Sequence, residues 1–351
     1  MLRKKFVVNG RFLTRKITGV ERYAGEMLKN LDEMVSEGEV ILAVPPNALY
    51  VPEFKNIKTV VVKGRFSGIL WENLTFVRFV KKNKAISLNL CNTAPLINPG
   101  VCCIHDLKIK AHPEYFGKKF VKWYKILFGN QTKRCKLILT NSEFSKAELL
   151  KYYPDTKPEI VITPLGWDHY GNFEKDENAL IKYGLTKDNY FFSMSSLEPN
   201  KNIKWIINAA KANEKYTFAI AGSVNEKVFA KAGGYEKEVI PKNIKFLGFI
   251  SDEEGKMLFE NCKAFLYPTF YEGFGIPPLE AYSAGCKRVV VSDTQIMHEI
   301  LNDTAFFVNP NYYNESLDDL PTPDKEQIDI LLKKYTWKNG AIKLYNALCR
   351  L

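Results

Sequence analysis

Short apolar runs alternate with longer amphipathic segments along the whole chain, and this pattern limits the possible folds more than any other feature. Runs of strand length separated by helix-length segments are typical of a parallel sheet covered by helices. A polar region, residues 168–188, divides the pattern into halves, and 351 residues suffice for two domains. The sequence therefore predicts an α/β protein with two Rossmann-like domains, residues 1–167 and 168–336. The predicted strands are 6–9, 40–44, 59–62, 85–89, 101–106, 137–140 and 161–166, followed by 190–194, 217–222, 244–247, 264–267, 288–292 and 305–308.

The composition is that of a globular protein, with 46% hydrophobic and 25% charged residues. No run reaches the ~20 apolar residues of a membrane span, and the basic start is followed only by a strand-length apolar run, unlike a signal peptide. The seven cysteines, an odd number without C-x-x-C spacing, indicate a reducing compartment. We therefore expect a cytoplasmic protein.

The net charge of +11 is unevenly placed. Residues 1–165 hold 28 Lys and Arg against 14 Asp and Glu, whereas residues 166–351 hold 22 against 25. The basic excess of the first half could serve nucleic acid, an anionic membrane surface or solubility alone.

Residues 267–281 combine a predicted strand, a loop with Gly273 and Gly275, and a helix opened by two prolines. Glycines allow a sharp bend and close approach to a ligand, and free amides at a helix start suit a phosphate. Glu272 and Glu280 would repel a phosphate, so we expect them to accept hydrogen bonds from hydroxyls. Phosphate and hydroxyls side by side describe a nucleotide sugar. The alternative is an ordinary strand-loop-helix connection with two surface acids.

The same stretch resembles the E-x7-E signature of family-four retaining glycosyltransferases, which have the two-domain GT-B fold. The resemblance implies that Glu272 contacts hydroxyls of the donor sugar, as a catalytic residue, and that Glu280 contacts the ribose. The loop residues Gly273, Phe274, Gly275 and Ile276 are then donor-binding residues. It also implies domains facing across a cleft, with the terminal helix, residues 337–351, packing back on the first.

The loop after the first predicted strand leads into a helix that Thr18 or Gly19 would cap. A Thr-Gly cap alone is weak evidence, but the segment resembles the family's opening loop, which faces the donor phosphates and the acceptor. The resemblance implies a donor-binding role for Gly19 and acceptor-side roles for Thr18 and Arg22.

Two further strand-end loops resemble the family. Residues 90–95 match a subgroup, which places Asn92 on the acceptor side. His105 and Asp106 follow the apolar run 101–104. A lone histidine at a strand end is usually structural, but the family's equivalent points at the donor sugar near the bond being broken. We therefore expect His105 to be catalytic and Asp106 to lie on the acceptor side.

Lys201 lies near a helix start after a predicted strand, where a diphosphate partner and an ordinary solvated lysine are both reasonable. In the family this loop carries a basic pair, an Arg and the Lys. Here Asn200 precedes the lysine and Ser196 occupies the other common Arg position. We expect Lys201 to be catalytic and all three residues to bind donor, with Lys287 or Arg288 compensating for the missing Arg.

These features predict a retaining hexosyltransferase that uses a nucleotide-diphosphate sugar and a glycan or lipid-linked acceptor. Family analogy suggests bacterial surface polysaccharide or O-antigen assembly. No D-x-D motif occurs, so no metal or other cofactor is expected. The alternatives are an inverting GT-B transferase or a sugar-nucleotide epimerase, neither of which should carry this glutamate pair. A basic nucleic-acid-binding protein is a further alternative, but no recognised nucleic-acid motif is present.

Residues 116–128 read as a helix with an aromatic face and four lysines elsewhere on its surface. Together with the basic first half, this predicts peripheral binding to the cytoplasmic face of an anionic membrane. The competing interpretation is that the aromatics pack on the sheet and the lysines are only solvated. The aromatic face comprises Phe116, Phe120, Trp123, Tyr124 and Leu127, and the lysines are Lys118, Lys119, Lys122 and Lys125.

Overall fold

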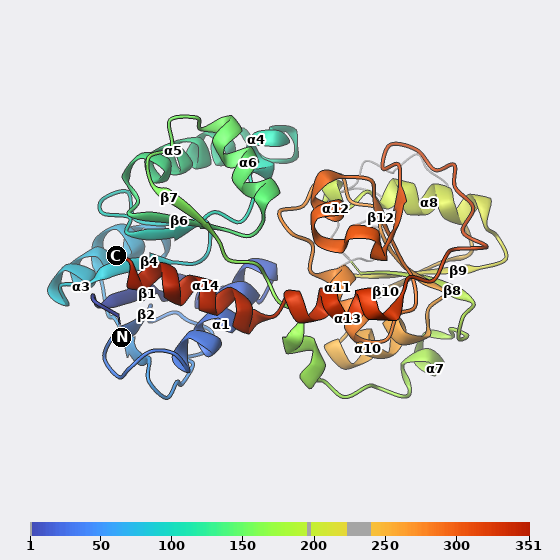
Figure 1. Ribbon diagram of the computed structural model, residues 1–351, viewed down its shortest axis with the longest axis horizontal. Coiled ribbons are helices and arrows are strands. Elements are labelled where there is room, and N and C mark those ends of the chain that lie inside the picture. Colours follow the sequence, from blue (N-terminus) through green and yellow to red (C-terminus); the bar gives the residue numbers. More distant parts are fainter. Residues whose placement is uncertain (1, 195–197, 223–239) are drawn as a thin grey trace. The chain divides into compact units, whose positions relative to one another are not determined.

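The computed structural model describes residues 2–194, 198–222 and 240–351. Two compact units make up the chain (Figure 1). Unit 1 consists of Met1–Gly166 and Thr336–Leu351, and unit 2 of Trp167–Tyr335. Each unit is built on its own parallel sheet, which confirms the predicted α/β class with two parallel-sheet domains.

Unit 1 has a seven-stranded sheet in the order β3-β2-β1-β4-β5-β6-β7, and every pairing is parallel. Most of its strands are uninterrupted apolar runs because helices cover both faces of the sheet. The strands are β1 (Phe6–Asn9), β2 (Val40–Val44), β3 (Lys58–Val61), β4 (Ile86–Asn89), β5 (Val101–Cys103), β6 (Leu137–Thr140) and β7 (Glu159–Ile162).

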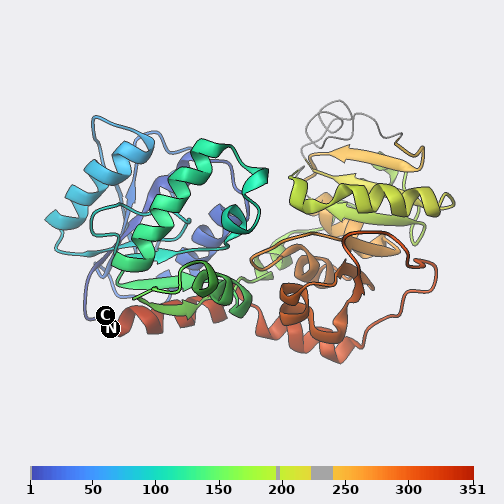
Figure 2. The ribbon, with the colours of Figure 1, turned by 90° about the horizontal axis from the view of Figure 1, so that it is seen from above.

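The helices of unit 1 lie on two sides of the sheet. The C-terminal helix α14 packs on α1, with the Trp337 and Tyr23 ring centroids 6.2 Å apart. In Figure 2, α14 and α3 lie on opposite sides of this unit. The segments are η1 (Gly10–Thr14), α1 (Gly19–Asp32), α2 (Gly68–Leu70), η2 (Trp71–Phe76), α3 (Val77–Lys82), α4 (Lys108–Ala111), η3 (Pro113–Tyr115), α5 (Lys118–Arg134), α6 (Glu143–Tyr152) and α14 (Trp337–Cys349).

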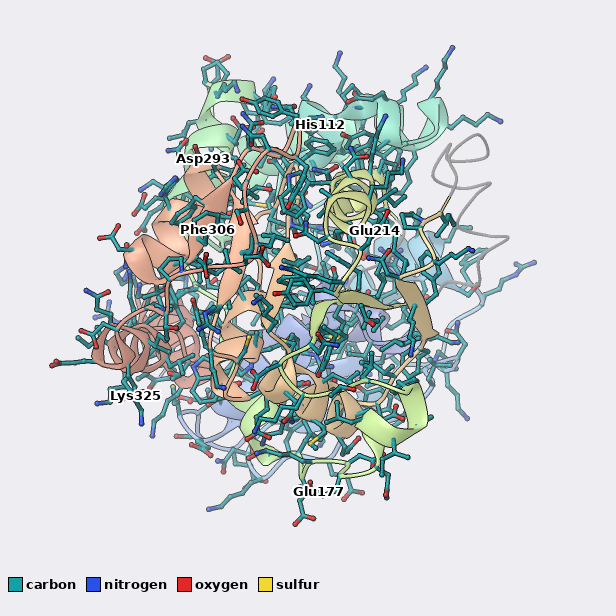
Figure 3. The ribbon with its side chains drawn as sticks, turned by 90° about the vertical axis from the view of Figure 1, so that its right-hand side faces the viewer. His112, Glu177, Glu214, Asp293, Phe306 and Lys325 are labelled. Atoms are coloured by element: carbon teal, nitrogen blue, oxygen red, sulfur yellow. The ribbon has the colours of Figure 1, made fainter. Side chains whose placement is uncertain are left out.

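Unit 2 has a six-stranded parallel sheet in the order β10-β9-β8-β11-β12-β13. Figure 3 views this unit with its side chains, and the labelled Glu177, Glu214 and Lys325 extend from its surface. The strands are β8 (Tyr190–Met194), β9 (Thr217–Ala221), β10 (Ile244–Gly248), β11 (Ala264–Tyr267), β12 (Val289–Ser292) and β13 (Phe306–Val308). The helical segments are η4 (Asp168–Asn172), α7 (Ala179–Tyr183), η5 (Pro199–Lys201), α8 (Ile203–Ala212), α10 (Asp252–Asn261), α11 (Pro277–Ser283), α12 (Gln295–Leu301), η6 (Asn302–Thr304) and α13 (Lys325–Lys334).

Several elements of unit 1 differ from what the sequence pattern indicates. The predicted strand 161–166 is β7, Glu159–Ile162, and the predicted strand 101–106 ends at Cys103. The amphipathic segment 68–80 is typical of one uninterrupted helix, but the π-helix η2 interrupts it. The helix expected to start at Phe116 starts at Lys118, because Phe116 ends a separate 3-10 turn opened by Pro113. Phe116 therefore contributes to the aromatic cluster from outside the helix, where its ring lies 5.7 Å from that of Phe120.

Candidate active site

The loop between β11 and α11 has a conformation that requires glycine. Gly275 has a φ of +88°, and a Cβ atom there would lie 2.8 Å from the Cε atom of Met297. An L-residue is strained at such a φ, whereas glycine adopts it readily. The loop is therefore shaped by Gly275, as the motif suggested.

The free amides lie in the loop and not in the first turn of α11, which corrects part of the prediction. Prolines at 277 and 278 have no N–H, and the amides of Leu279 and Glu280 both donate to the Ile276 carbonyl. By contrast, none of the described residues accepts a hydrogen bond from the backbone amides of 274–276. The backbone amides of this segment that could donate to an anion therefore lie in the loop, not in the first turn of α11.

Lys201 and Glu272 meet because their strands are neighbours. β8 pairs with β11, so the loops that follow them leave the same edge of the sheet. The Lys201 Nζ atom lies 2.7 Å from Glu272 Oε1, and the two side chains are only 16% and 14% exposed. The ammonium also donates to the Tyr267 hydroxyl at 3.2 Å. Burial, reinforced by the Glu272 charge, raises the pKa of Tyr267 well above its usual value, so this hydroxyl stays neutral.

Asn200, which stands where the family has an arginine, holds the glycine loop. Its side-chain amide donates to the Tyr271 carbonyl at 3.1 Å and to Glu272 Oε1 at 3.5 Å. Its own carbonyl accepts from the Phe270 amide at 2.8 Å. The buried Asn200 Oδ1 atom has no hydrogen-bond partner among the described residues. Ser196 lies outside the described residues.

The suggestion that Lys287 or Arg288 compensates for the missing arginine is wrong. Lys287 Nζ lies 3.4 Å from Asp188 Oδ1, and Arg288 Nε donates to the Leu320 carbonyl at 2.9 Å. Both residues precede β12, whereas Lys201 follows β8. In a parallel sheet these positions lie at opposite edges.

Glu280 has a neighbour that sequence reasoning missed. His169, on η4, places its Nε2 atom 3.1 Å from Glu280 Oε1, and both side chains are less than 10% exposed. A buried carboxylate needs a polar or charged partner, and His169 is a close polar neighbour, although its Nε2 atom is not aligned for a hydrogen bond with the carboxylate. The histidine lies in the polar region that the sequence presented only as a connection between domains.

His105, in unit 1, has both ring nitrogens engaged. Nε2 lies 2.7 Å from the Leu90 carbonyl, and Nδ1 lies 3.0 Å from the Asn141 amide nitrogen. The neutral tautomer with its proton on Nε2 satisfies both contacts. Burial lowers the pKa of His105, which favours this neutral form. Proton exchange would break one of these contacts, so the catalytic role of His105 stays a prediction.

Asn92 and Asp106 both organise backbone beside His105. Asn92 adopts a φ of +59° and its Oδ1 accepts from the His105 amide at 2.8 Å. Asp106 Oδ1 accepts from the Lys108 amide at 2.9 Å. These contacts leave their acceptor-side roles as predictions.

The opening loop is exposed. Thr18 is the N-cap residue of α1, but its hydroxyl donates to the Glu21 carboxylate and makes no side-chain cap. Around Gly19 there is open space for a ligand. Arg22 is half-buried, and its amide donates to the Thr18 carbonyl at 2.8 Å.

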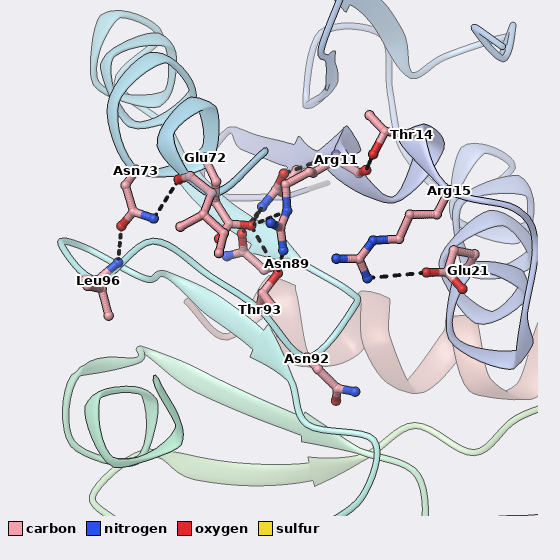
Figure 4. A network of polar contacts seen from close by, with 12 residues as sticks. Arg11, Thr14, Arg15, Glu21, Glu72, Asn73, Asn89, Asn92, Thr93 and Leu96 are labelled. Carbon is pink, nitrogen blue, oxygen red and sulfur yellow. Dashed lines mark hydrogen bonds and ion pairs between the residues drawn. The ribbon is translucent and has the colours of Figure 1, made fainter. Parts of the chain in front are cut away.

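A buried ion pair at the same edge of the unit 1 sheet was also missed (Figure 4). Arg11 Nε lies 3.1 Å from Glu72 Oε2, with side-chain exposures of 10% and 2%. Asn9 donates to the same carboxylate oxygen at 2.8 Å, and Arg11 also donates to the Thr93 hydroxyl at 2.6 Å. Arg11 and Glu72 are far apart in sequence, since Arg11 follows β1 and Glu72 lies in η2 after β3. Thr93 joins them because it follows β4, which pairs with β1.

Comparison with known proteins shows that the sequence is similar to glycosyltransferases. Residues 175–320 match the family described as glycosyl transferases group 1. The O-antigen chain mannosyltransferase RfbU of Salmonella typhimurium is 27% identical over 319 residues, which cover 87% of each chain. The O-antigen chain mannosyltransferase B of Escherichia coli is 29% identical over 228 residues, which cover 60% of this chain and 57% of that relative.

Solved structures show the fold. Sucrose-phosphate synthase from Thermosynechococcus elongatus has a TM-score of 0.73 at 14% identity, with 99% of both chains covered. Anabaena HepE in complex with UDP and glucose has a TM-score of 0.72 at 16% identity, covering 99% of this chain and 100% of that chain. The two parallel-sheet units have the fold of these GT-B glycosyltransferase structures. Within this fold, residues 175–320 carry a group 1 glycosyl transferase domain, which confirms the predicted glycosyltransferase resemblance of that part of the chain.

Proposed function

We propose that this glycosyltransferase moves a mannosyl residue from a nucleotide-diphosphate donor to a saccharide acceptor in bacterial O-antigen assembly. The choice of mannose and of O-antigen rests on the names of the relatives. The observation that carries the donor assignment is the Lys201–Glu272 pair beside a loop with unused amides. Cation, carboxylate and amide donors at one sheet edge match the leaving diphosphate and the sugar hydroxyls of such a donor.

In this proposal, binding of the donor replaces the Lys201–Glu272 ion pair with contacts from each residue to the donor. Lys201 turns from Glu272 to the diphosphate, and the amides of 274–276 donate to the same group. The freed Glu272 carboxylate then accepts hydrogen bonds from sugar hydroxyls. Preorganised donors aimed at the growing negative charge favour departure of the leaving group. Glu280, held by His169, binds the ribose.

We further propose that the reaction retains the anomeric configuration and requires no metal. NMR analysis of the product anomer, with and without EDTA, tests both statements. We expect the donor's anomeric configuration in the product and full activity in EDTA. An inverted product, or activity that EDTA abolishes and manganese restores, would contradict them.

The donor is tested by hydrolysis and transfer assays across GDP-, UDP- and dTDP-sugars. Turnover of a nucleotide-linked mannose above all other sugars supports the proposal. Preference for another sugar would refute the mannose assignment while leaving the transferase class intact.

The membrane proposal rests on α5. Phe120 and Ile126 are 47% and 52% exposed, and Lys118, Lys119, Lys122 and Lys125 are exposed. In the described part of the chain no helix is long and apolar enough to span a bilayer. Near an anionic surface each basic residue contributes about 1 kcal/mol, so four together would give reversible binding. Vesicle co-sedimentation tests this, and binding that survives reversal of the four lysines to Glu would refute it.

A further inference from the structure

A second basic feature of unit 1 shares no lining residue with the loops assigned to donor and acceptor. The segment after β3 and the helix α3 enclose an open pocket of about 300 Å³. Its lining combines four cations with apolar and hydroxyl groups and includes no carboxylate. The basic lining residues are Lys63, Arg65, Arg78 and Lys82, and the others are Val62, Gly64, Phe66, Thr75 and Phe79.

The positive charge of this pocket is not neutralised by the protein. None of the four cations has an ion pair or side-chain hydrogen bond with another described residue. Between residues 54 and 105 the sequence has one acid, Glu72, against eight Lys and Arg. Glu72 is buried with its carboxylate on Arg11, so it cannot serve the pocket. Four clustered like charges repel one another, and a bound anion would offset that repulsion.

The pocket is preformed. The Val62 carbonyl accepts from Trp71 Nε1 at 3.0 Å, which ties the loop to the helix. Gly64 approaches so closely that a Cβ atom there would lie 2.3 Å from the Thr75 Oγ1 atom. The backbone that carries Lys63 and Arg65 is therefore fixed against the helix before a ligand binds, which lowers the ordering cost of binding.

The pocket lies on the same side of the unit 1 sheet as α5. The β3-to-β4 and β5-to-β6 connections advance across the sheet in one direction, so right-handed crossovers put α3 and α5 on one face. Leu96 joins them directly, because its amide donates to Asn73 Oδ1 at 2.9 Å and its carbonyl accepts from Asn130 Nδ2 at 3.1 Å. The pocket and the α5 lysines therefore belong to one basic layer.

We propose that this pocket is a phosphate site that takes the headgroup of an anionic lipid. The cations bind the phosphate, and Val62, Phe66 and Phe79 accept the apolar part of the molecule next to it. An amphiphile fits this lining better than free phosphate, which offers the aromatic groups nothing. The proposal rests on the membrane contact proposed for α5 and adds a defined lipid-binding position to it.

The test uses the whole protein and two lysines as reporters. Lys63 and Lys82 are acylated with acetic anhydride, and the extent at each is measured by mass spectrometry. The probes are monomeric dihexanoyl phosphatidylglycerol, dihexanoyl phosphatidylcholine and glycerol phosphate at equal concentration. Salt is kept near 0.15 M, where surface charges beyond about 8 Å are screened. We expect phosphatidylglycerol to protect both lysines severalfold.

Two double variants distinguish the effect of the pocket cations from the effect of the protein's overall positive charge. Arg65→Gln with Arg78→Gln removes two lining cations and keeps both reporters, whereas Lys58→Gln with Lys81→Gln removes two cations outside the lining. At about fivefold per cation, the arginine pair should weaken half-saturation about 25-fold, and the lysine pair should change it little. Equal effects of the two pairs, or equal protection by phosphatidylcholine, would overturn the proposal.

Two further outcomes are decisive. If glycerol phosphate protects as well as the lipid, the ligand is a free phosphate and the lipid assignment is wrong. Reversal of the four α5 lysines should leave protection by monomeric lipid intact, which separates failure of this site from failure of the α5 contact. Loss of protection in that variant would overturn the proposal.

Discussion

Replacing Lys201 with Met should affect stability and turnover by separate routes. Lys201 and Glu272 are about 85% buried, and their charged contact is 2.7 Å long. Without the ammonium, the Glu272 carboxylate keeps the long 3.5 Å contact to Asn200 and the hydrogen bond from the Tyr267 hydroxyl, both with neutral groups. A hydrogen bond between charged groups contributes about 1.5–3 kcal/mol. A loss of about 2 kcal/mol should lower the melting temperature by roughly 4–8 °C in a unit of this size.

The effect on turnover follows from the leaving group. If Lys201 holds the departing diphosphate, losing about 1.5–3 kcal/mol of transition-state stabilisation should lower kcat about 10- to 150-fold. The assay combines thermal unfolding with steady-state transfer for Lys201→Met, Glu272→Gln and the double variant. Adding Glu272→Gln should restore part of the stability lost in Lys201→Met, because no charged carboxylate is stranded. It should not restore turnover, since both residues contact the donor.

Lys215 provides a matched control. Its Nζ atom lies 2.8 Å from Asp318 Oδ1, but the two side chains are 62% and 42% exposed. Exposed pairs contribute little, so Lys215→Met should leave melting temperature and kcat nearly unchanged. The reasoning fails if Lys201→Met melts like the wild type, or if its kcat is unaltered.

Gly275→Ala should destabilise the protein by about 1–2 kcal/mol, because alanine is strained in the left-handed backbone conformation of that residue. Gly25→Ala, in the interior of α1 with open space around it, should stabilise the protein by about 0.5–1 kcal/mol. Denaturant titration of both variants compares their free energies of unfolding. His169→Ala should raise the donor KM about as much as Glu280→Ala does, with little change in kcat. His169→Gln should bring the KM part of the way back to the wild-type value. An unchanged KM in His169→Ala would exclude a positioning role. Burial lowers the pKa of His105, so the unfolded chain binds its proton first as pH falls below about 6.5 and stability declines by up to about 1.4 kcal/mol per pH unit. A His105→Gln variant should lose that part of the slope in unfolding measured from pH 7 to 5.

The strands and the donor loop could be predicted because their signals are local. An apolar run such as Ala264–Tyr267 identifies a buried strand by itself, and the structure has those same bounds. The π-helix η2 could not be predicted, since its amphipathic pattern is compatible with an uninterrupted α-helix.

Contacts between elements that are distant in sequence could not be predicted from the sequence. His169 meets Glu280 only when η4 packs on α11, and neither residue carries a local sign of the other. Arg288 failed as a phosphate partner for a different reason: it lies at the start of its strand, and in a parallel sheet the strand starts lie at the edge opposite the donor loop.

The packing of α14 on α1 has a consequence for how the protein is made. Gly340 lies so close to the Pro164 carbonyl that a Cβ atom would approach it to 2.4 Å, and Trp337 is fully buried. This helix is synthesised after all of unit 2, although it completes the unit whose strands all precede unit 2 in the chain. During synthesis one apolar face of α1 in unit 1 therefore stays exposed until all of unit 2 has been translated. A nascent chain stalled just before Thr336 should bind hydrophobic-surface chaperones through its first half, and translation through α14 should end that binding.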